Sequence, residues 1–171
     1  MRLIYRVSAT VIASLSLGSV ATAQTSGNIT ARATVRQPIV IAAGQDLDFG
    51  IVLQGTPKSV ASTAALAGRF DATGTPSANV NINFTLPATL SDGGPNTLPI
   101  GTWTGCFNQT AAVNSSGCTA IASMAGTTPT AFGNVAGTGR LWVFVGATVT
   151  PGAAQVVGNY TGTVTMTLTY F

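Results

Sequence analysis

Residues 160–171 read YTGTVTMTLTYF, and polar and apolar side chains alternate along almost the whole stretch. A period of two places successive side chains on opposite faces of a β-strand. Threonines form one face, and the other face carries Tyr160, Val164, Met166, Leu168 and Tyr170. A strand needs a neighbour for its main-chain hydrogen bonds, and chain ends fray unless they are held. The partner of this strand is therefore the main functional question.

Short runs of the same kind recur along the chain, separated by Gly, Pro, Asn and Asp. Further strands are predicted at residues 39–41, 47–52, 59–63, 68–72, 78–86, 98–106, 140–149 and 155–157. A turn is expected at 44–46, a bulge at Gly50, and a loop at 129–139 from which Phe132 packs inward. Short strands at this spacing predict an all-β fold, an antiparallel immunoglobulin-like β-sandwich.

The N-terminal residues resemble an export signal. Arg2 and Arg6 precede an apolar stretch at 7–20, and Ala21-Thr22-Ala23 fits a cleavage site. The stretch is too short and too rich in serine for a membrane anchor, so no membrane span is expected after cleavage. The expected organisation is a signal peptide at 1–23, an extended arm at 24–37 and a β-sandwich domain at 38–171. The protein is expected in the periplasm and then at the cell surface or outside the cell.

Composition argues against several classes of function. Only 6% of the residues are charged, and the chain contains neither histidine nor glutamate. Ser/His/Asp and Cys/His catalytic arrangements are therefore excluded, and we expect no enzyme activity and no cofactor. The basic residues beyond the signal are scattered and form no stripe that would predict nucleic-acid binding. Trp103 and Trp142 are expected in the core rather than stacked on a sugar.

Two pairs of residues invite a more specific interpretation. Cys106 and Cys118 lie in a chain expected to be exported, and we predict a disulfide between them rather than a metal or redox pair. Asp46 and Asp48 lie two apart, on one face of an extended segment, where they could hold a cation. A turn and strand-edge role for the two carboxylates is the simpler interpretation, and a metal site is not expected.

An alternating segment also lies near the other end of the chain. In residues 28–36 small and apolar side chains alternate with polar ones. One interpretation is an ordinary closed sandwich, in which the last strand pairs within its own chain. The other is strand exchange, in which the N-terminal segment of one molecule completes the sheet of the next. A contact of that head-to-tail kind builds open filaments.

Both ends of the chain resemble a known family. The segments ITARATV at 29–35, PIVI at 38–41, LDFG at 47–50 and GNYTGTVTMTLTY at 158–170 are similar to the spore coat protein U family. They also resemble an allied family of small secreted bacterial proteins of unknown function. The first family usually carries a cysteine soon after the first strand. None occurs at residues 37–40, which favours the allied family.

The resemblance implies a structural, pilin-like subunit. Its expected partners are like subunits, a periplasmic chaperone that holds it and an usher that exports it into fibres for adhesion or biofilm. The donor residues implied are Ile29, Ala31, Ala33 and Val35. The residues implied at the acceptor edge, which first meet the chaperone, are Val164, Met166, Leu168 and Tyr170. The alternative is a self-contained secreted or surface β-sandwich that binds a carbohydrate or protein ligand.

Overall fold

The structure, a computed structural model, describes residues 25–171, and the expected signal peptide at 1–23 lies outside them. The chain divides into two units, one before and one after the bond between Thr34 and Val35. Residues 25–34 contain no helix or strand, and their side chains are exposed. Residues 35–171 form the folded domain described below.

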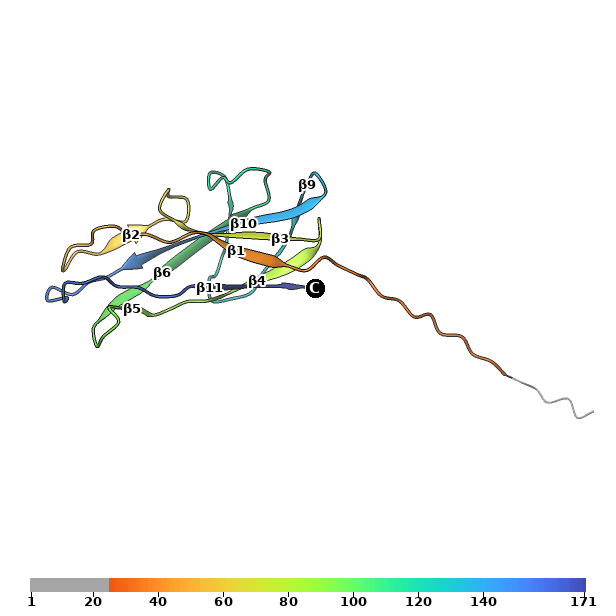
Figure 1. Ribbon diagram of the computed structural model, residues 1–171, viewed down its shortest axis with the longest axis horizontal. Helices are drawn as coiled ribbons and strands as arrows, with labels where there is room; N and C mark the ends of the chain where they lie inside the picture. Colours follow the sequence, from red (N-terminus) through yellow and green to blue (C-terminus); the bar gives the residue numbers. More distant parts are fainter. Residues whose placement is uncertain (1–24) are drawn as a thin grey trace, which may run out of the picture. The chain divides into compact units, whose positions relative to one another are not determined.

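The domain is built from antiparallel strands, as the sequence predicts, and is consistent with an immunoglobulin-like β-sandwich (Figure 1). No helix among the described residues is long and apolar enough to cross a membrane. The strands are β1 Val40–Gln45, β2 Lys58–Val60, β3 Gly68–Gly74, β4 Asn79–Thr85, β5 Thr89–Ser91, β6 Thr97–Asn108, β7 Thr119–Ala120, β8 Thr128–Ala131, β9 Gly133–Val135, β10 Thr138–Val149 and β11 Thr165–Tyr170.

Two sheets of unequal width face each other. The wide sheet has the order β1-β3-β10-β6-β5, with β2 and β9 also paired to β10 and β7 to β6. The narrow sheet has the order β11-β4-β8. Strand β10, predicted at 140–149, is central and apolar on both faces: Leu141, Val143 and Val145 enter the main core, while Trp142 and Phe144 pack on the other face. Strands β1 and β11 each have a single partner strand in the described chain.

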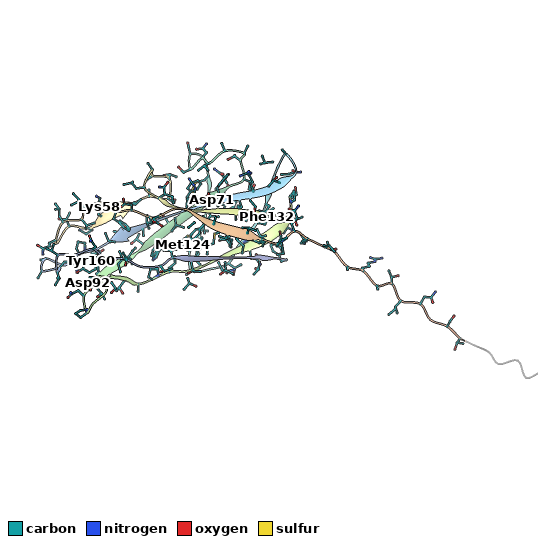
Figure 2. The ribbon with its side chains drawn as sticks, in the orientation of Figure 1. Lys58, Asp71, Asp92, Met124, Phe132 and Tyr160 are labelled. Carbon is teal, nitrogen blue, oxygen red and sulfur yellow. A yellow bond between two sulfur atoms is a disulfide. The ribbon has the colours of Figure 1, made fainter. Side chains whose placement is uncertain are left out.

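The main core lies between the sheets. It is formed by side chains of β4, β10 and β11, with Phe132 buried at one end, as predicted. A second apolar cluster, centred on Phe49, Ile100 and Val149, lies toward the other end. Figure 2 shows Lys58 and Tyr160 near that second end and Phe132 at the first. The loop before β2 and the loop after β10 share the second end, while the C-terminus lies at the first (Figure 1).

A β-bulge in β6 determines which of its side chains face the core. Gly146 lies opposite Thr104 and Thr148 opposite Gly101, so Thr102 and Trp103 together oppose a single residue of β10. Thr102 has a left-handed backbone with φ of 48°. The extra residue shifts the alternation by one, so Trp103 packs against the second cluster, which contains Leu98 and Ile100, and also against the main core. Its expected core position is confirmed, although it remains partly exposed.

The predicted disulfide is confirmed. Cys106 and Cys118 are bonded, with their Cα atoms 5.6 Å apart. Cys106 is buried on the outer face of the wide sheet, beside Trp142 and Phe144. The indole nitrogen of Trp142 donates a hydrogen bond to the Thr110 carbonyl at 2.8 Å. The disulfide therefore helps to hold the 109–118 loop over an apolar strip that would otherwise face solvent.

Several predicted local elements are wrong. The expected turn at 44–46 is partly strand, because β1 continues to Gln45 with a bulge beside Ala43. Residues 47–52 and 155–157 form no strand, and the expected loop at 129–139 contains β8 and β9. Residues 39–41 are not a buried run, since Val40 is 57% exposed. Each error falls at a sheet edge, where pairing is decided by distant residues rather than by local pattern.

Candidate functional site

A groove lies along the side of the sandwich where both sheets are open. Its volume is about 970 Å³, and its lining extends from Ala43 to Val164. One wall is the extended segment at 43–54, which continues β1, and the other is the segment at 155–164, which leads into β11. The groove thus lies between the segment that follows β1 of the wide sheet and the segment that precedes β11 of the narrow one.

The floor of the groove is apolar. Val145 and Val149 come from β10, Phe70 comes from β3, and Trp103 comes from the bulge of β6. The same cavity is lined by Phe49, Leu98 and Ile100, which belong to the second core cluster. These side chains face the groove because inward positions recur at every second residue of β10 and because the bulge turns Trp103 inward. Phe70 and Trp103 are partly exposed, whereas the other five side chains are at most 9% exposed, so the groove lies over the hydrophobic core and opens little of it.

Local hydrogen bonds fix the first wall. Asp48 accepts a hydrogen bond from the Gly50 amide at 2.7 Å, while its own amide donates to the Leu66 carbonyl at 3.1 Å. Gly50 has a left-handed φ of 58°, which glycine adopts without steric cost. The Lys58 ammonium donates to the Ile51 carbonyl at 2.8 Å. A segment outside regular strand is thereby held in one conformation.

The second wall is organised around Tyr160. Its hydroxyl donates to the Val156 carbonyl at 2.7 Å and accepts from the Gln155 side-chain amide at 2.9 Å. The two walls are joined at this end, because the Gly55 amide donates to the Gly152 carbonyl at 3.0 Å. The Gln54 side chain also donates to the Gln155 carbonyl at 2.5 Å. The groove therefore has a closed and ordered end near Tyr160.

The main-chain groups along β11 show which side of the strand is free. The Phe171 amide donates to the Asn79 carbonyl, and the Phe132 amide donates to the Ala78 carbonyl. In an antiparallel ladder, bonded and non-bonded pairs alternate. With the observed register, odd-numbered residues of β11 bond to β4, and the N–H and C=O groups of Met166 and Leu168 point away from it. Among the described strands, none pairs with this side of β11.

The four predicted acceptor residues have different surroundings. Val164 lines the groove at the entrance to β11. The side chains of Met166 and Leu168 enter the main core and are 5% and 8% exposed. Tyr170 lies at the opposite end of the strand, half-buried against Phe132. The structure thus brings Val164 alone of the four into the groove lining; Met166 and Leu168 lie beyond the lining, on a strand whose outward main-chain groups have no partner strand among the described residues.

Tyr170 also fixes the point where the N-terminal segment joins the domain. Its hydroxyl accepts a hydrogen bond from the Thr75 amide at 2.8 Å and donates to the Gln37 carbonyl at 2.9 Å. The Gln37 amide donates to the Thr75 hydroxyl at 2.7 Å. The guanidinium of Arg36 lies 5.2 Å from the centre of the Tyr170 ring, within range of a cation–π interaction. Arg36 and Gln37 are therefore anchored at the C-terminal end of β11.

The predicted donor residues remain outside any strand. Ile29 is 98% exposed and Val35 is 93% exposed, and Ala31 and Ala33 are also exposed. Exposed large apolar side chains are common on protein surfaces, but here they alternate regularly with polar ones in a segment without secondary structure. The segment has the side-chain pattern of a strand and, within residues 25–34, none of the pairing.

The carboxylates offer no assembled metal site. Within residues 25–171, no group of three or more His, Cys, Asp or Glu is placed to hold a metal ion. Asp46 and Asp48 are exposed on the wall of the groove, and Asp48 closes a local turn. Asp92 closes another turn, where the hydrogen bond from the Asn96 side chain, followed by that from the Gly94 amide, lowers the pKa of its carboxyl.

No protein-family model matches this chain, and no curated protein matches it either. The functional interpretation therefore rests on the groove and on the two ends of the chain.

Most of the groove lining was missed by sequence reasoning. Phe49 and Trp103 had been assigned to strands of the core, and Tyr160 had been assigned to the terminal strand itself. One signal was available in the alternation of Leu47, Phe49 and Ile51, which resembles a strand although the segment pairs with none. Leu47 and Phe49 pack against the second core cluster, whereas Ile51, after the left-handed Gly50, is 84% exposed, so the alternation holds for the first two residues only.

Proposed function

We propose that this protein is a structural, pilin-like subunit that assembles with copies of itself by β-strand exchange. In this proposal, residues 28–35 of one molecule enter the groove of the next and pair with the free side of β11, while Arg36 stays against Tyr170 of its own domain. The resulting fibre or coat lies at the cell surface and serves adhesion or biofilm formation. The observation that carries the proposal is the apolar groove, whose lining reaches Val164 directly before β11, together with the unpaired main-chain groups on the free side of β11.

The N-terminal segment has the main-chain groups and the alternating apolar side chains that a strand inserted into the groove requires. An inserted strand would give main-chain hydrogen bonds to β11 and place alternate side chains on the apolar floor. Ile29, Ala31, Ala33 and Val35 alternate as such a strand requires. Donor segment and groove are different surfaces of one chain, so the contact is heterologous and repeats without closing. Growth of open filaments follows from that geometry.

The resemblance to the spore coat protein U family supports the same proposal. It suggests that a periplasmic chaperone covers the groove before assembly and that an usher exports the subunit. An exposed apolar groove with a free strand edge is prone to uncontrolled association, which such a chaperone prevents. The disulfide between Cys106 and Cys118 is compatible with an oxidising compartment on that route.

The first experiment compares two arm variants of the exported chain, residues 24–171. Ile29→Asp with Val35→Asp puts charges on the side that enters the groove, whereas Thr30→Asp with Thr34→Asp puts the same charges on the other side. We expect the first variant to remain monomeric and the second to form polymers like the parent chain. Burying an unpaired carboxylate costs several kcal/mol, so polymer yield should fall at least about 100-fold.

Light scattering and electron microscopy measure the outcome, and circular dichroism checks that both variants fold. Since Ile29 and Val35 are exposed in the isolated chain, neither substitution should disturb the domain. Equal polymer formation by the two variants, or a parent chain that stays monomeric at every concentration, contradicts strand exchange through this arm.

A self-contained binding module is the second candidate, and one observation favours it. Phe49, Phe70, Trp103 and Tyr160 all line the groove, and aromatic faces of this kind stack on sugars or on peptide side chains. On this alternative the groove binds an external carbohydrate or extended peptide. A monomeric parent chain whose groove resonances move on addition of oligosaccharides, and not on addition of the arm peptide, would favour the module.

A further inference from the structure

The wall of the groove carries two carboxylates for which the described chain supplies no cation. Asp46 and Asp48 are both exposed and both line the groove. Among residues 25–171 the only ion pair is formed by Arg69 and Asp71, with 2.6 Å between the two groups. The third charged residue of the lining, Arg69, is thus already neutralised. On the same wall the Lys58 ammonium donates to the Ile51 carbonyl, so Asp46, Asp48 and Lys58 together leave the wall with an excess of one negative charge.

The arm carries a matching positive charge on its polar side. Arg32 alternates with Ala31 and Ala33, so it lies on the side opposite the apolar residues of the segment. Arg36 has the same parity, but it is stacked on Tyr170 of its own domain. Arg32 is consequently the one cation of residues 25–35 that a second molecule can receive. It lies midway between Ile29 and Val35, the two largest apolar side chains of the arm.

We propose that Asp46 and Asp48 receive Arg32 from the arm of a second copy of this chain, and that this charge contact sets the register of the inserted strand. The inference rests on the proposed strand exchange. When the apolar side of the arm faces the floor, Arg32 faces the mouth of the groove, where the carboxylates stand. A slip of two residues keeps every apolar side chain inward but moves the guanidinium by about 7 Å.

The contact acts on recognition and rate rather than on affinity alone. Exposed ion pairs in proteins contribute little, a factor of about 1.5 to 5 in binding. Opposite charges at the rim of an interface, by contrast, raise the association rate several-fold at low ionic strength and suppress wrong partners. The surface of this protein carries few charges. The contact between Arg32 and the two carboxylates therefore distinguishes the arm of a like subunit from an alternating segment of another protein that lacks the arginine.

The test uses the full exported chain with Ile29→Asp and Val35→Asp as an acceptor that cannot donate its own arm. The probe is a synthetic peptide of residues 24–37, either with Arg32 or with Arg32→Gln. Each peptide is measured against the acceptor and against the same acceptor carrying Asp46→Asn and Asp48→Asn. Association and dissociation rates are recorded at about 20 mM and about 500 mM salt, since screening weakens exposed pairs.

We expect Arg32→Gln to slow association by about 3- to 10-fold at low salt with the parent acceptor, and to have no effect with the Asn acceptor. The difference should vanish at high salt. A charge-exchanged pair, Arg32→Asp in the peptide with Asp46→Arg in the acceptor, should restore the rate, and it leaves the hydrogen bond between Asp48 and the Gly50 amide in place. The two Asn substitutions themselves should leave the melting temperature of the acceptor within about 2 °C, as for most surface changes.

The possible results distinguish a failure of the charge contact from a failure of the proposed strand exchange. If the peptide binds with the same rates in all four combinations, strand insertion stands and the charge contact is wrong. If no peptide binds, although the acceptor is folded, both the contact and the proposed strand exchange are wrong. The contact is also wrong if Arg32→Gln slows association by the same factor with the parent acceptor and with the Asn acceptor, since that result shows no coupling between Arg32 and the two carboxylates.

Discussion

Tyr170 is the residue through which the last strand holds the start of the domain. Its hydroxyl bridges the Thr75 amide and the Gln37 carbonyl, and its ring contacts Phe132 and Arg36. The sequence placed this side chain on the apolar side of the strand, and its ring is indeed half-buried. What the alternation could not reveal is that its hydroxyl reaches residues 95 and 133 positions away.

We predict that Tyr170→Phe lowers the free energy of unfolding by about 1–2 kcal/mol, because it removes two hydrogen bonds and leaves a partly buried amide without its acceptor. Tyr160→Phe is the matched control, since that hydroxyl bonds only within the exposed loop at 155–160. Urea titration of both variants measures the difference. If Tyr160→Phe lowers the free energy of unfolding more than Tyr170→Phe does, the anchoring of Gln37 is not what stabilises the C-terminal end of β11.

At the scale of elements, the bulge in β6 is the feature that opens the groove onto an aromatic floor. Thr102 has a left-handed backbone there, which is costly for a β-branched residue and free for glycine. We predict that Thr102→Gly is neutral or stabilises the domain by up to about 1 kcal/mol.

The control for that substitution is Thr104→Gly, two residues along the same strand. Thr104 is likewise exposed but is not among the residues with positive φ, so the change should destabilise by about 1 kcal/mol. Thermal unfolding of both variants gives the comparison. A loss at Thr102 equal to the loss at Thr104 would contradict the strained bulge and with it the account of how Trp103 is turned toward the groove.

Strands that are buried on at least one face could be predicted from the sequence. Strands β3, β4, β6, β10 and β11 lie within a few residues of their predicted bounds, because burial imposes the period of two on their side chains. The short strands β8 and β9 were missed, and residues 47–52 were wrongly assigned to a strand. In both cases the assignment depends on whether another strand lies close enough to form main-chain hydrogen bonds. The alternation of polar and apolar side chains does not carry that information.

Some residues of the groove could likewise be predicted from the sequence, and others could not. Val164, which the family resemblance implies at an acceptor edge and the alternation assigns to the apolar side of the last strand, lies in the groove lining. Trp103 could not be predicted there, since a one-residue bulge reverses parity without leaving a pattern in the side chains. The disulfide was predictable because the chain has only two cysteines, in a sequence with an apparent export signal.

At the scale of the whole molecule, the wide sheet has more strands than the narrow sheet, which leaves one side of the sandwich uncovered. The wide sheet buries β10 between neighbours on both sides, whereas the narrow sheet has three strands and ends at β11. A sandwich with an open seam exposes core side chains that a closed one would bury. One added strand between β1 and β11 would cover the groove, and residues 28–35 are long enough, at about 3.3 Å per residue, to span roughly 26 Å.

In the proposed assembly, the free side of β11 receives a strand from another molecule. Hydrogen exchange measured at single amides of β11 tests this pairing most directly. The amides of Thr167 and Thr169 point toward β4 and should be protected in monomer and polymer alike. The amides of Met166 and Leu168 point away from β4 and should exchange quickly in the monomer, then roughly 100-fold more slowly in the polymer. Polymers in which Met166 and Leu168 exchange as fast as in the monomer would contradict this pairing.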